Sequence, residues 1–218
     1  TAVIARWLQK YGYRVAVVPQ PNWRDDLRDF RKLGAPRLYF GVNSGAMDSM
    51  VNHYTAAKRL RSDDAYTPEG KAGQRPDYAV TVYTKILKEI YPEVPVIIGG
   101  IEASLRRVTH YDYWQNSLKP SVLVESGADW LCYGMGERTM LEFTKAIEAG
   151  RNVNDIRKIP QLGFYMDGRC RTKDAVILNS YERCTKDKVA FAENFHVVET
   201  YANMMHPPVL VEPVGNGY

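Results

Sequence analysis

The sequence predicts an α/β protein built on an open, doubly wound and mostly parallel sheet. Up to residue 150, short runs of β-branched and aromatic residues alternate with segments whose apolar residues recur at helical spacing. Strand–helix–strand repeats of this kind form parallel units with helices on both faces of the sheet. The composition agrees, because a chain of 218 residues with 45% hydrophobic and 25% charged residues is typical of a soluble globular protein.

The first elements alternate between helix and strand. The spacing predicts helices over residues 2–11, 23–33 and from about residue 48, and strands over residues 14–18 and 37–42. Gly12 and Gly34 follow the first two helices, where a residue in the left-handed conformation commonly ends a helix. Sheets of this class usually begin with a central strand, whereas this chain begins with a helix. We therefore expect the first strand of the sheet to lie before Thr1.

The middle of the chain supplies the other predicted strands of the sheet. Residues 60–75 are rich in charge, Gly and Pro and predict a long surface loop, which is uncommon unless it covers a site. Pro76 suits the start of a helix that continues to Pro92. Two apolar runs and one amphipathic segment then predict strands over residues 94–98 and 129–133 and a helix over residues 139–149.

The pattern changes after residue 150. Residues 162–166 and 175–178 predict an antiparallel hairpin around Asp167 and Gly168. A long helix over residues 185–205 and the start of another hairpin at residues 209–211 follow. We therefore expect an α/β domain over residues 1–155 and a hairpin and long-helix connector over residues 156–218. The apolar stripe around Phe191 and Phe195 is expected to pack on the part of the protein that follows Tyr218.

Charge, apolar runs and cysteines restrict the partners and the compartment. The net charge is only +4, and basic residues are interleaved with acidic ones, which argues against nucleic acid as a partner. The longest apolar run is far shorter than the roughly 20 residues that cross a bilayer, which argues against a membrane protein. Cys132, Cys170 and Cys184 are odd in number and widely spaced, which indicates reduced thiols and a cytoplasmic protein.

The sequence lacks the common catalytic and cofactor motifs. Gly134 and Gly136 begin a dinucleotide fingerprint, but Thr139 stands at its third glycine position, and the sequence has no phosphate-binding Gly-Lys-Ser/Thr loop. The four histidines are scattered and form no pair with His or Cys at zinc spacing. We therefore predict no catalytic residue and no metal ligand in this chain. An enzyme that uses NAD or a nucleotide sugar is the weakest interpretation.

Glycines and small polar residues follow three of the predicted strands. Ligands bind at the carboxyl ends of the strands in an open parallel sheet, and glycine there lets the backbone approach a ligand. The same residue types also serve ordinary turns and helix caps, so each loop alone supports either interpretation. Because the three loops agree, we predict a cofactor-binding or ligand-binding site formed by Asn43, Ser44, Gly45, Gly99, Gly100, Glu102, Ser104, Gly134, Gly136, Glu137 and Thr139.

Two other segments favour a different class of protein, a non-catalytic module that binds RNA or another protein. Residues 58–75 form a loop with several basic side chains, and residues 109–116 combine His110 with three aromatic residues that can stack on a flat ligand. A surface loop folded over the edge of the sheet explains the second segment equally well.

Several strings of this sequence resemble one family. They are Gly-Gly-Ile-Glu-Ala-Ser-Leu-Arg-Arg at residues 99–107, His-Tyr-Asp-Tyr-Trp at 110–114, Tyr-Gly-Met-Gly-Glu at 133–137 and Gly-Val-Asn-Ser-Gly-Ala-Met-Asp at 41–48. Over nearly its whole length the chain resembles the N-terminal region of the YgiQ-type radical S-adenosylmethionine (SAM) proteins. The strand ends also resemble those of cobalamin-binding-like domains that precede radical SAM barrels. The resemblance implies a cobalamin-binding-like or flavodoxin-like sheet.

The same resemblance implies an accessory domain of a radical SAM enzyme. In that family a CxxxCxxC motif downstream holds a [4Fe-4S] cluster and SAM, so the implied partner is the downstream barrel of the same polypeptide. The substrate, a small molecule or a macromolecule, is left open. The three cysteines of this chain do not have that spacing, so no cofactor is expected here and the chain alone should be inactive. Cobalamin binding also stays open, because the ligating histidine of such domains follows the first strand, which we expect before Thr1.

Overall fold

The computed structural model describes residues 1–202 and 204–218. Residues 1–107 and 122–164 form one compact unit, and residues 108–121 and 165–218 form a second. The protein is α/β, as the sequence predicts, with a mostly parallel sheet in the first unit and a long helix in the second. The division at residue 155 into a domain and a connector stays a prediction, as does a further strand before Thr1.

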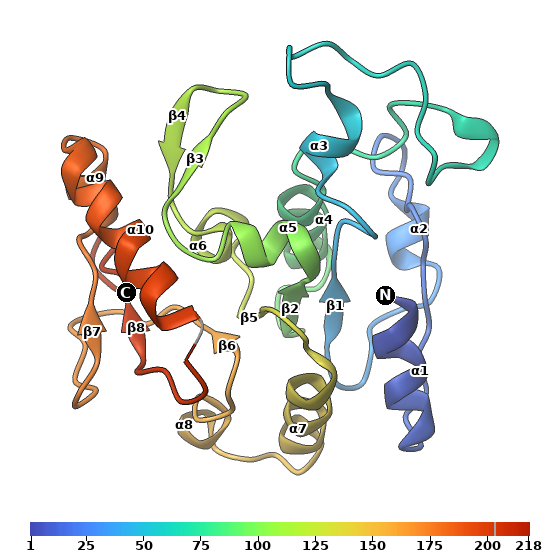
Figure 1. Cartoon of the computed structure of the whole chain (residues 1–218). Coiled ribbons are helices and arrows are strands. Elements are labelled where there is room, and N and C mark those ends of the chain that lie inside the picture. Colours follow the sequence, from blue (N-terminus) through green and yellow to red (C-terminus); the bar gives the residue numbers. More distant parts are fainter. Residues whose placement is uncertain (203) are drawn as a thin grey trace. The chain divides into compact units, whose positions relative to one another are not determined.

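The sheet of the first unit has four strands in the order β1-β2-β5-β6 (Figure 1). They are β1 (Phe40–Val42), β2 (Val96–Gly99), β5 (Trp130–Cys132) and β6 (Leu162–Gly163). The first three run parallel, with Gly41 beside Ile97 and Ile98 beside Leu131, and β6 is antiparallel to β5. β1 and β5 lie within the predicted strand segments, and β2 overlaps the predicted segment 94–98 and extends one residue further, to Gly99.

Helices precede and connect these strands in the first unit. They are α1 (Ala2–Lys10), α2 (Arg28–Arg31), α3 (Ser49–His53), the 3-10 turn η1 (Pro68–Gly70), α4 (Ala79–Ile90), α5 (Gly100–Leu105), α6 (Val122–Ser126), α7 (Glu137–Glu148) and α8 (Val153–Ile156). Within residues 1–202 and 204–218, every helix falls short of the length and apolar character that crossing a bilayer requires.

Helices cover both faces of the sheet because the strands are apolar on both sides. Ile97 and Trp130 join Phe143 and Ala146 of α7 in one buried cluster, and α1 packs against α7 on that side. Successive strand residues point to opposite faces, so the buried Val96 and Ile98 of β2 point away from this cluster. The helix α4 packs against β1 and β2 and also contacts α6.

Two N-terminal predictions are wrong. Residues 14–18 form no strand, since Pro19 directly follows the run and proline lacks the N–H that a ladder needs. The predicted helix at 23–33 shrinks to α2, because the side chains of Asp25 and Asp26 accept hydrogen bonds from the backbone N–H groups of Leu27 and Arg28. These local bonds compete with helix formation, and Leu27 adopts a left-handed φ of 58°.

The second unit contains two small sheets and two helices. β3 (His110–Asp112) and β4 (Ser117–Lys119) form an antiparallel hairpin, and β7 (Val176–Ile177) pairs in parallel with β8 (Leu210–Val211). The helices are α9 (Tyr181–Cys184) and α10 (Lys188–Ala202). The predicted long C-terminal helix is therefore confirmed over residues 188–202, whereas residues 185–187 and 204–205 of its predicted span are not helical. Residue 203 of that span lies outside the described residues.

The hairpin predicted at residues 162–178 is wrong. A tight two-residue hairpin turn of type I′ requires a positive φ at both central residues, and of the predicted pair only Gly168, with φ 91°, has one. Each half pairs elsewhere, since β6 joins β5 and β7 joins β8. Met166 instead exchanges backbone hydrogen bonds of 2.8 and 2.9 Å with Tyr218, so the C-terminal residues take the place of the expected return strand.

Candidate binding rim at the carboxyl ends of the strands

The three parallel strands bring their following loops to one edge of the sheet (Figure 1). A Cβ atom built on Gly100 would lie 3.2 Å from Cβ of Asn43. The backbone N–H of Gly134 donates a hydrogen bond of 3.3 Å to Oγ of Ser104. The predicted site residues of all three loops therefore lie together. We call this edge the strand-end rim and define it as residues 43–45, 99–104 and 134–139.

Each of the three loops contains one glycine in the left-handed conformation. The φ angles are 106° at Gly45, 82° at Gly100 and 70° at Gly134. A side chain at such a position costs roughly 1–2 kcal/mol, so glycine is required by the turns themselves. The space is also limited, because a Cβ on Gly134 would lie 3.0 Å from Nε2 of Gln161.

The rim residues differ in their access to solvent. Ser44, Glu102 and Thr139 are buried, and their polar groups are bonded inside the protein. Solvent reaches the exposed Gly45, Gly100 and Gly134 and the half-buried Asn43, Gly99, Ser104, Gly136 and Glu137. Apart from the exposed side chains of Ile101, Met135 and Arg138, a ligand or a partner domain at the rim would therefore meet mainly backbone and short polar side chains.

The carboxylate of Glu102 holds the starts of two helices. Its side chain is only 1% exposed. Oε1 accepts a hydrogen bond of 2.9 Å from the N–H of Val80 in α4, and Oε2 accepts one of 2.8 Å from the N–H of Ser49 in α3. A negative charge at helix N-termini is favourable. Glu102 therefore positions the rim, since both of its oxygens are already bonded.

Asp48 also stabilises the start of α3, in addition to Glu102. Its Oδ1 accepts hydrogen bonds from the N–H groups of Met50 and Val51, which makes it the N-cap of α3. Its Oδ2 pairs with the guanidinium of Arg106, which follows α5. The loop after β1 is thus tied to the helix after β2.

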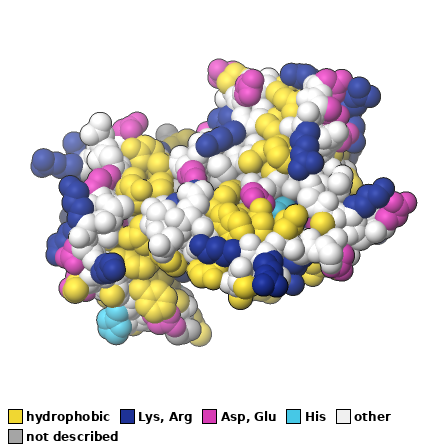
Figure 2. Space-filling model, turned by 90° about the horizontal axis from the view of Figure 1, so that it is seen from above, with side chains coloured by type: hydrophobic (Ala, Val, Ile, Leu, Met, Phe, Trp, Pro, Cys, Tyr) yellow, Lys and Arg dark blue, Asp and Glu magenta, His cyan; other side chains and the backbone are white. Residues whose placement is uncertain are grey.

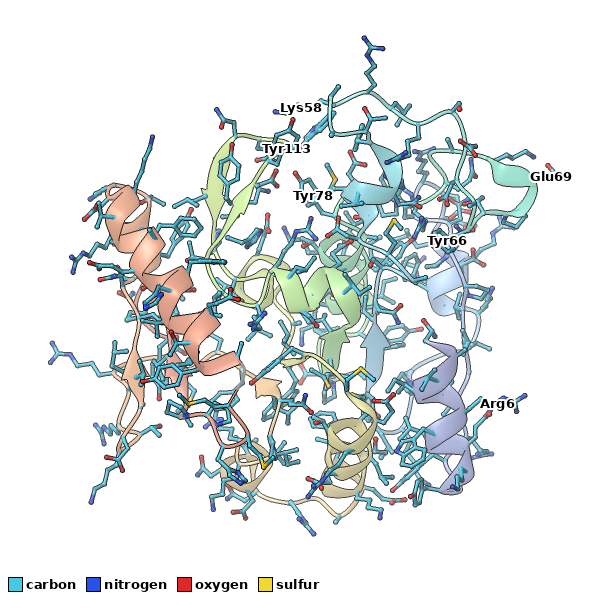
Figure 3. The ribbon with its side chains drawn as sticks, in the orientation of Figure 1. Arg6, Lys58, Tyr66, Glu69, Tyr78 and Tyr113 are labelled. Carbon is cyan, nitrogen blue, oxygen red and sulfur yellow. The ribbon has the colours of Figure 1, made fainter. Side chains whose placement is uncertain are left out.

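A buried ion pair anchors the long loop to the rim. Nε and Nη2 of Arg75 donate to Oδ2 of Asp64 at 3.2 and 2.9 Å, and the two side chains are 4% and 1% exposed. Nη1 of Arg75 donates a hydrogen bond of 2.8 Å to the carbonyl of Ser44 in the rim. Figure 3 labels Tyr66 and Glu69, which lie on this loop. The predicted loop at residues 60–75 is therefore held in place by the ion pair between Asp64 and Arg75 and by the hydrogen bond from Arg75 to the backbone of Ser44.

The hydrogen bonds to Asp64 keep it charged. Burial by itself raises the pKa of this carboxyl, but the N–H of Tyr66 and the guanidinium of Arg75 donate to it, and the net pKa lies below the usual value. The ion pair therefore persists at neutral pH.

Three polar side chains, His53, Tyr54 and Asp77, form a hydrogen-bonded cluster at the end of α3. Nδ1 of His53 is 2.8 Å from Oδ1 of Asp77, and the hydroxyl of Tyr54 donates a 2.7 Å hydrogen bond to Oδ2 of the same carboxylate. His53 is 5% exposed, and its Nε2 is buried without a hydrogen-bond partner among the described residues. Sequence spacing gave no signal for this cluster, because Asp77 lies beyond the long loop.

The third loop packs tightly against a cysteine. A Cβ atom on Gly136 would lie 2.8 Å from Sγ of Cys132. Burial, followed by the charge of Glu137, raises the pKa of the Cys132 thiol to about 11. The thiol is therefore protonated at neutral pH and is a poor nucleophile and metal ligand.

Three exposed apolar side chains lie in the rim or directly beside it. Ile101 and Leu105 lie one helical turn apart on α5 and are 51% and 63% exposed, and Met135 in the third loop is 77% exposed. They are sequence neighbours of Gly100, Ser104 and Gly134, which line the rim. We call these three side chains the rim patch. Figure 2 views the protein from above and shows hydrophobic surface bordered by Lys and Arg side chains.

Comparison with known proteins decides the family. The chain matches the family described as Radical SAM N-terminal over residues 1–218. It belongs to this family. The match extends over the whole chain, so it includes both compact units.

Relatives of this Radical SAM N-terminal domain are much longer proteins. It is 53% identical over 218 residues to a UPF0313 protein of Porphyromonas gingivalis and 49% identical over 232 residues to one of Bacteroides thetaiotaomicron. A UPF0313 protein of Clostridium botulinum is 45% identical over 197 residues. These matches cover 99%, 99% and 90% of this chain but 34%, 37% and 30% of the relatives, about a third of their length. No solved structure matches.

The residues of this Radical SAM N-terminal domain do not fit an iron–sulfur cluster. The described part of the chain contains no group of three or more His, Cys, Asp or Glu that could hold a metal ion. Its cysteines are unpaired thiols, and Cys132 and Cys184 are buried. The family suggests a [4Fe-4S] cluster and SAM for the full protein, which then need ligands outside these residues.

Sequence reasoning missed the residues that hold the rim in place. The pair of Asp64 and Arg75 spans 11 positions of an irregular loop, and no periodic pattern marks it. Glu102 was predicted as a site residue, yet its oxygens bind the helix starts. The rim patch left a weak signal, since Ile101 and Leu105 have the i, i+4 spacing of one helix face.

Proposed function

We propose that this chain is the accessory domain of a radical SAM enzyme and that its strand-end rim faces the downstream radical SAM domain of the same polypeptide. The observation that carries the proposal is the convergence of three parallel strand ends beside an exposed apolar patch. Ligands and partner domains bind open α/β sheets at this edge, and exposed apolar patches often mark interfaces. The family membership and the greater length of the relatives support a downstream domain.

The chemistry of the proposed enzyme belongs to the downstream domain. A [4Fe-4S] cluster with SAM, bound there, supplies reductive cleavage of SAM. The residues of this chain contribute a rigid surface, because Glu102, Asp48 and Arg75 hold the rim loops by internal bonds. The rim patch excludes water where the domains meet.

Cobalamin ligation is not part of the proposal. The strand-end rim contains no histidine. His53, in the helix after β1, has its Nδ1 at Asp77, and its Nε2 is closed to solvent.

The three free cysteines favour a reducing compartment, and we propose a cytoplasmic location for the protein.

The full-length protein tests the proposal. After anaerobic reconstitution with iron and sulfide, we expect a cluster and reductive cleavage of SAM. Leu105→Asp places a carboxylate in the rim patch and should lower the cleavage rate about tenfold or more, because a charge buried at an interface is strongly unfavourable. Leu33→Asp is the matched control, since Leu33 is 60% exposed and Leu105 is 63% exposed.

The outcomes separate the two parts of the proposal. A well-folded full-length protein that forms no cluster and cleaves no SAM would refute the radical SAM assignment. Equal rates for the two variants, with intact clusters, would show that the rim does not face the downstream domain.

The alternative, a module that binds RNA or a protein, has one favourable observation. Tyr111 on the β3–β4 hairpin is 49% exposed, and an exposed aromatic ring can stack on a base. The basic loop supports it less, because Arg75 is paired with Asp64 and Lys71 contacts Glu69. Retention on RNA that falls steeply with salt would favour the alternative.

A further inference from the structure

The helix α10 carries two neighbouring stripes of residues, of which the inner one contains a polar residue and the outer one is apolar. Each has the i, i+4, i+7, i+11 spacing of a helix-packing seam. The inner stripe is Ala190, Asn194, Val197 and Tyr201. The outer stripe is Phe191, Phe195, Val198 and Ala202.

The inner stripe attaches α10 to its own unit, largely through a polar clamp. Ala190 is fully buried and Asn194 is 6% exposed. Oδ1 of Asn194 accepts a 2.7 Å hydrogen bond from the N–H of Asn179, and its Nδ2 donates one of 2.8 Å to the carbonyl of Asn179. The helix thus satisfies a buried amide without burying its largest side chains.

The outer stripe is largely uncovered. Phe195 is 65% exposed, Ala202 is exposed, and Phe191 and Val198 are half-buried. An ordinary surface helix buries its aromatic residues and exposes its amides, whereas α10 buries Asn194 and exposes Phe195. A helix that is attached on one side and has an apolar stripe on the adjoining side normally packs on two sides.

The spacing and the family indicate what covers this stripe. Repeats of four and three residues are the pattern by which one helix packs against another. The chain spans about a third of its relatives, so most of the full-length protein is available as a partner. We propose that the outer stripe of α10 packs against a helix in the region that follows residue 218 of the full-length protein. The inference rests on the proposed function only in requiring a downstream region.

Site-specific photo-crosslinking of the full-length protein tests this. Benzoylphenylalanine replaces Phe195, which is exposed enough to accept it. A second protein carries it at Thr200, which is also exposed but points to the opposite side of the helix. After irradiation, mass spectrometry identifies the crosslinked peptides. No cluster or SAM is needed, so the result is independent of the activity test.

We expect position 195 to crosslink within one polypeptide to a single helical segment after residue 218, at a yield at least about fivefold above that from position 200. Crosslinks to a second copy of the chain would instead identify a dimer contact and overturn the proposal. Equal low yields from both positions would show that the stripe faces solvent and would also overturn it.

Discussion

Replacing Glu102 by glutamine tests whether the rim is held from inside. The variant keeps the shape of the side chain but converts one acceptor oxygen to an NH₂ group, so either Ser49 or Val80 loses its acceptor. A buried N–H without a partner costs about 1–3 kcal/mol, and the lost charge at two helix starts costs roughly 0.3–1 kcal/mol each. We therefore expect a loss of about 2–5 kcal/mol in the free energy of unfolding.

Thermal and urea unfolding measure this loss, and hydrogen exchange locates it. For a chain of this size, about 1 kcal/mol corresponds to roughly 2–4 °C in Tm. Exchange should speed up at the starts of α3 and α4 and leave α7 unchanged. The control is Glu93→Gln, because Glu93 is exposed and its replacement should change stability by less than about 0.5 kcal/mol. If the two variants unfold alike, Glu102 does not hold the rim.

Three further experiments test the loops and the second unit. Gly136→Ala should lower the free energy of unfolding by about 1–3 kcal/mol, because the new Cβ would lie 2.8 Å from Sγ of Cys132. Adding Cys132→Ala should relieve part of that loss. If thermal unfolding shows that the effects of the two substitutions are additive, the proposed clash is absent. Arg75→Met leaves Asp64 buried and unpaired, so it should lower the free energy of unfolding by about 3–5 kcal/mol and make residues 60–75 sensitive to protease. The double variant Arg75→Met with Asp64→Leu should recover much of this stability. An equal loss of stability in the single and double variants would contradict a stabilising ion pair. Burial raises the pKa of Glu212 despite the hydrogen bond from the N–H of Thr109, so its contribution to stability is present below the unfolded value near 4.5 and is lost as pH rises through the raised folded value. Glu212→Gln should therefore raise Tm at pH 7 and leave it nearly unchanged at pH 4, and equal shifts at both pH values would contradict this.

The proposed role of the domain depends on the stiffness of its rim. The exposed glycine backbones and the rim patch are the parts that a partner can contact, while the buried polar side chains are bonded within the unit. An interface surface that is preorganised in this way loses little conformational entropy on docking. The rim therefore suits a permanent contact within one polypeptide.

The helix α10 shows that this chain leaves one of its apolar helix stripes only partly buried. Its stripe of Phe191, Phe195, Val198 and Ala202 has the residue types of a core but only partial burial. A chain that spans about a third of its relatives' length need not bury every apolar stripe itself.

Features that depend on the local pattern of residues could be predicted from the amino-acid sequence. The apolar runs that became β1, β2 and β5, the helical spacing of α4 and α7, and the glycines after each strand were all visible, because strand and helix periodicities are local properties. The convergence of the three loops also followed, because parallel strands end at the same edge of a sheet.

The pairing of segments and the burial of polar groups could be learned only from the three-dimensional structure. The pairing of Met166 with Tyr218 joins residues 52 positions apart, and nothing in the local pattern of residues 162–178 distinguishes that partner from the nearer one. Glu102 resembled a ligand-binding residue until its two oxygens were found on the helix starts. Long-range hydrogen bonds and burial depend on how elements pack, and the spacing of residues along the chain does not specify that packing.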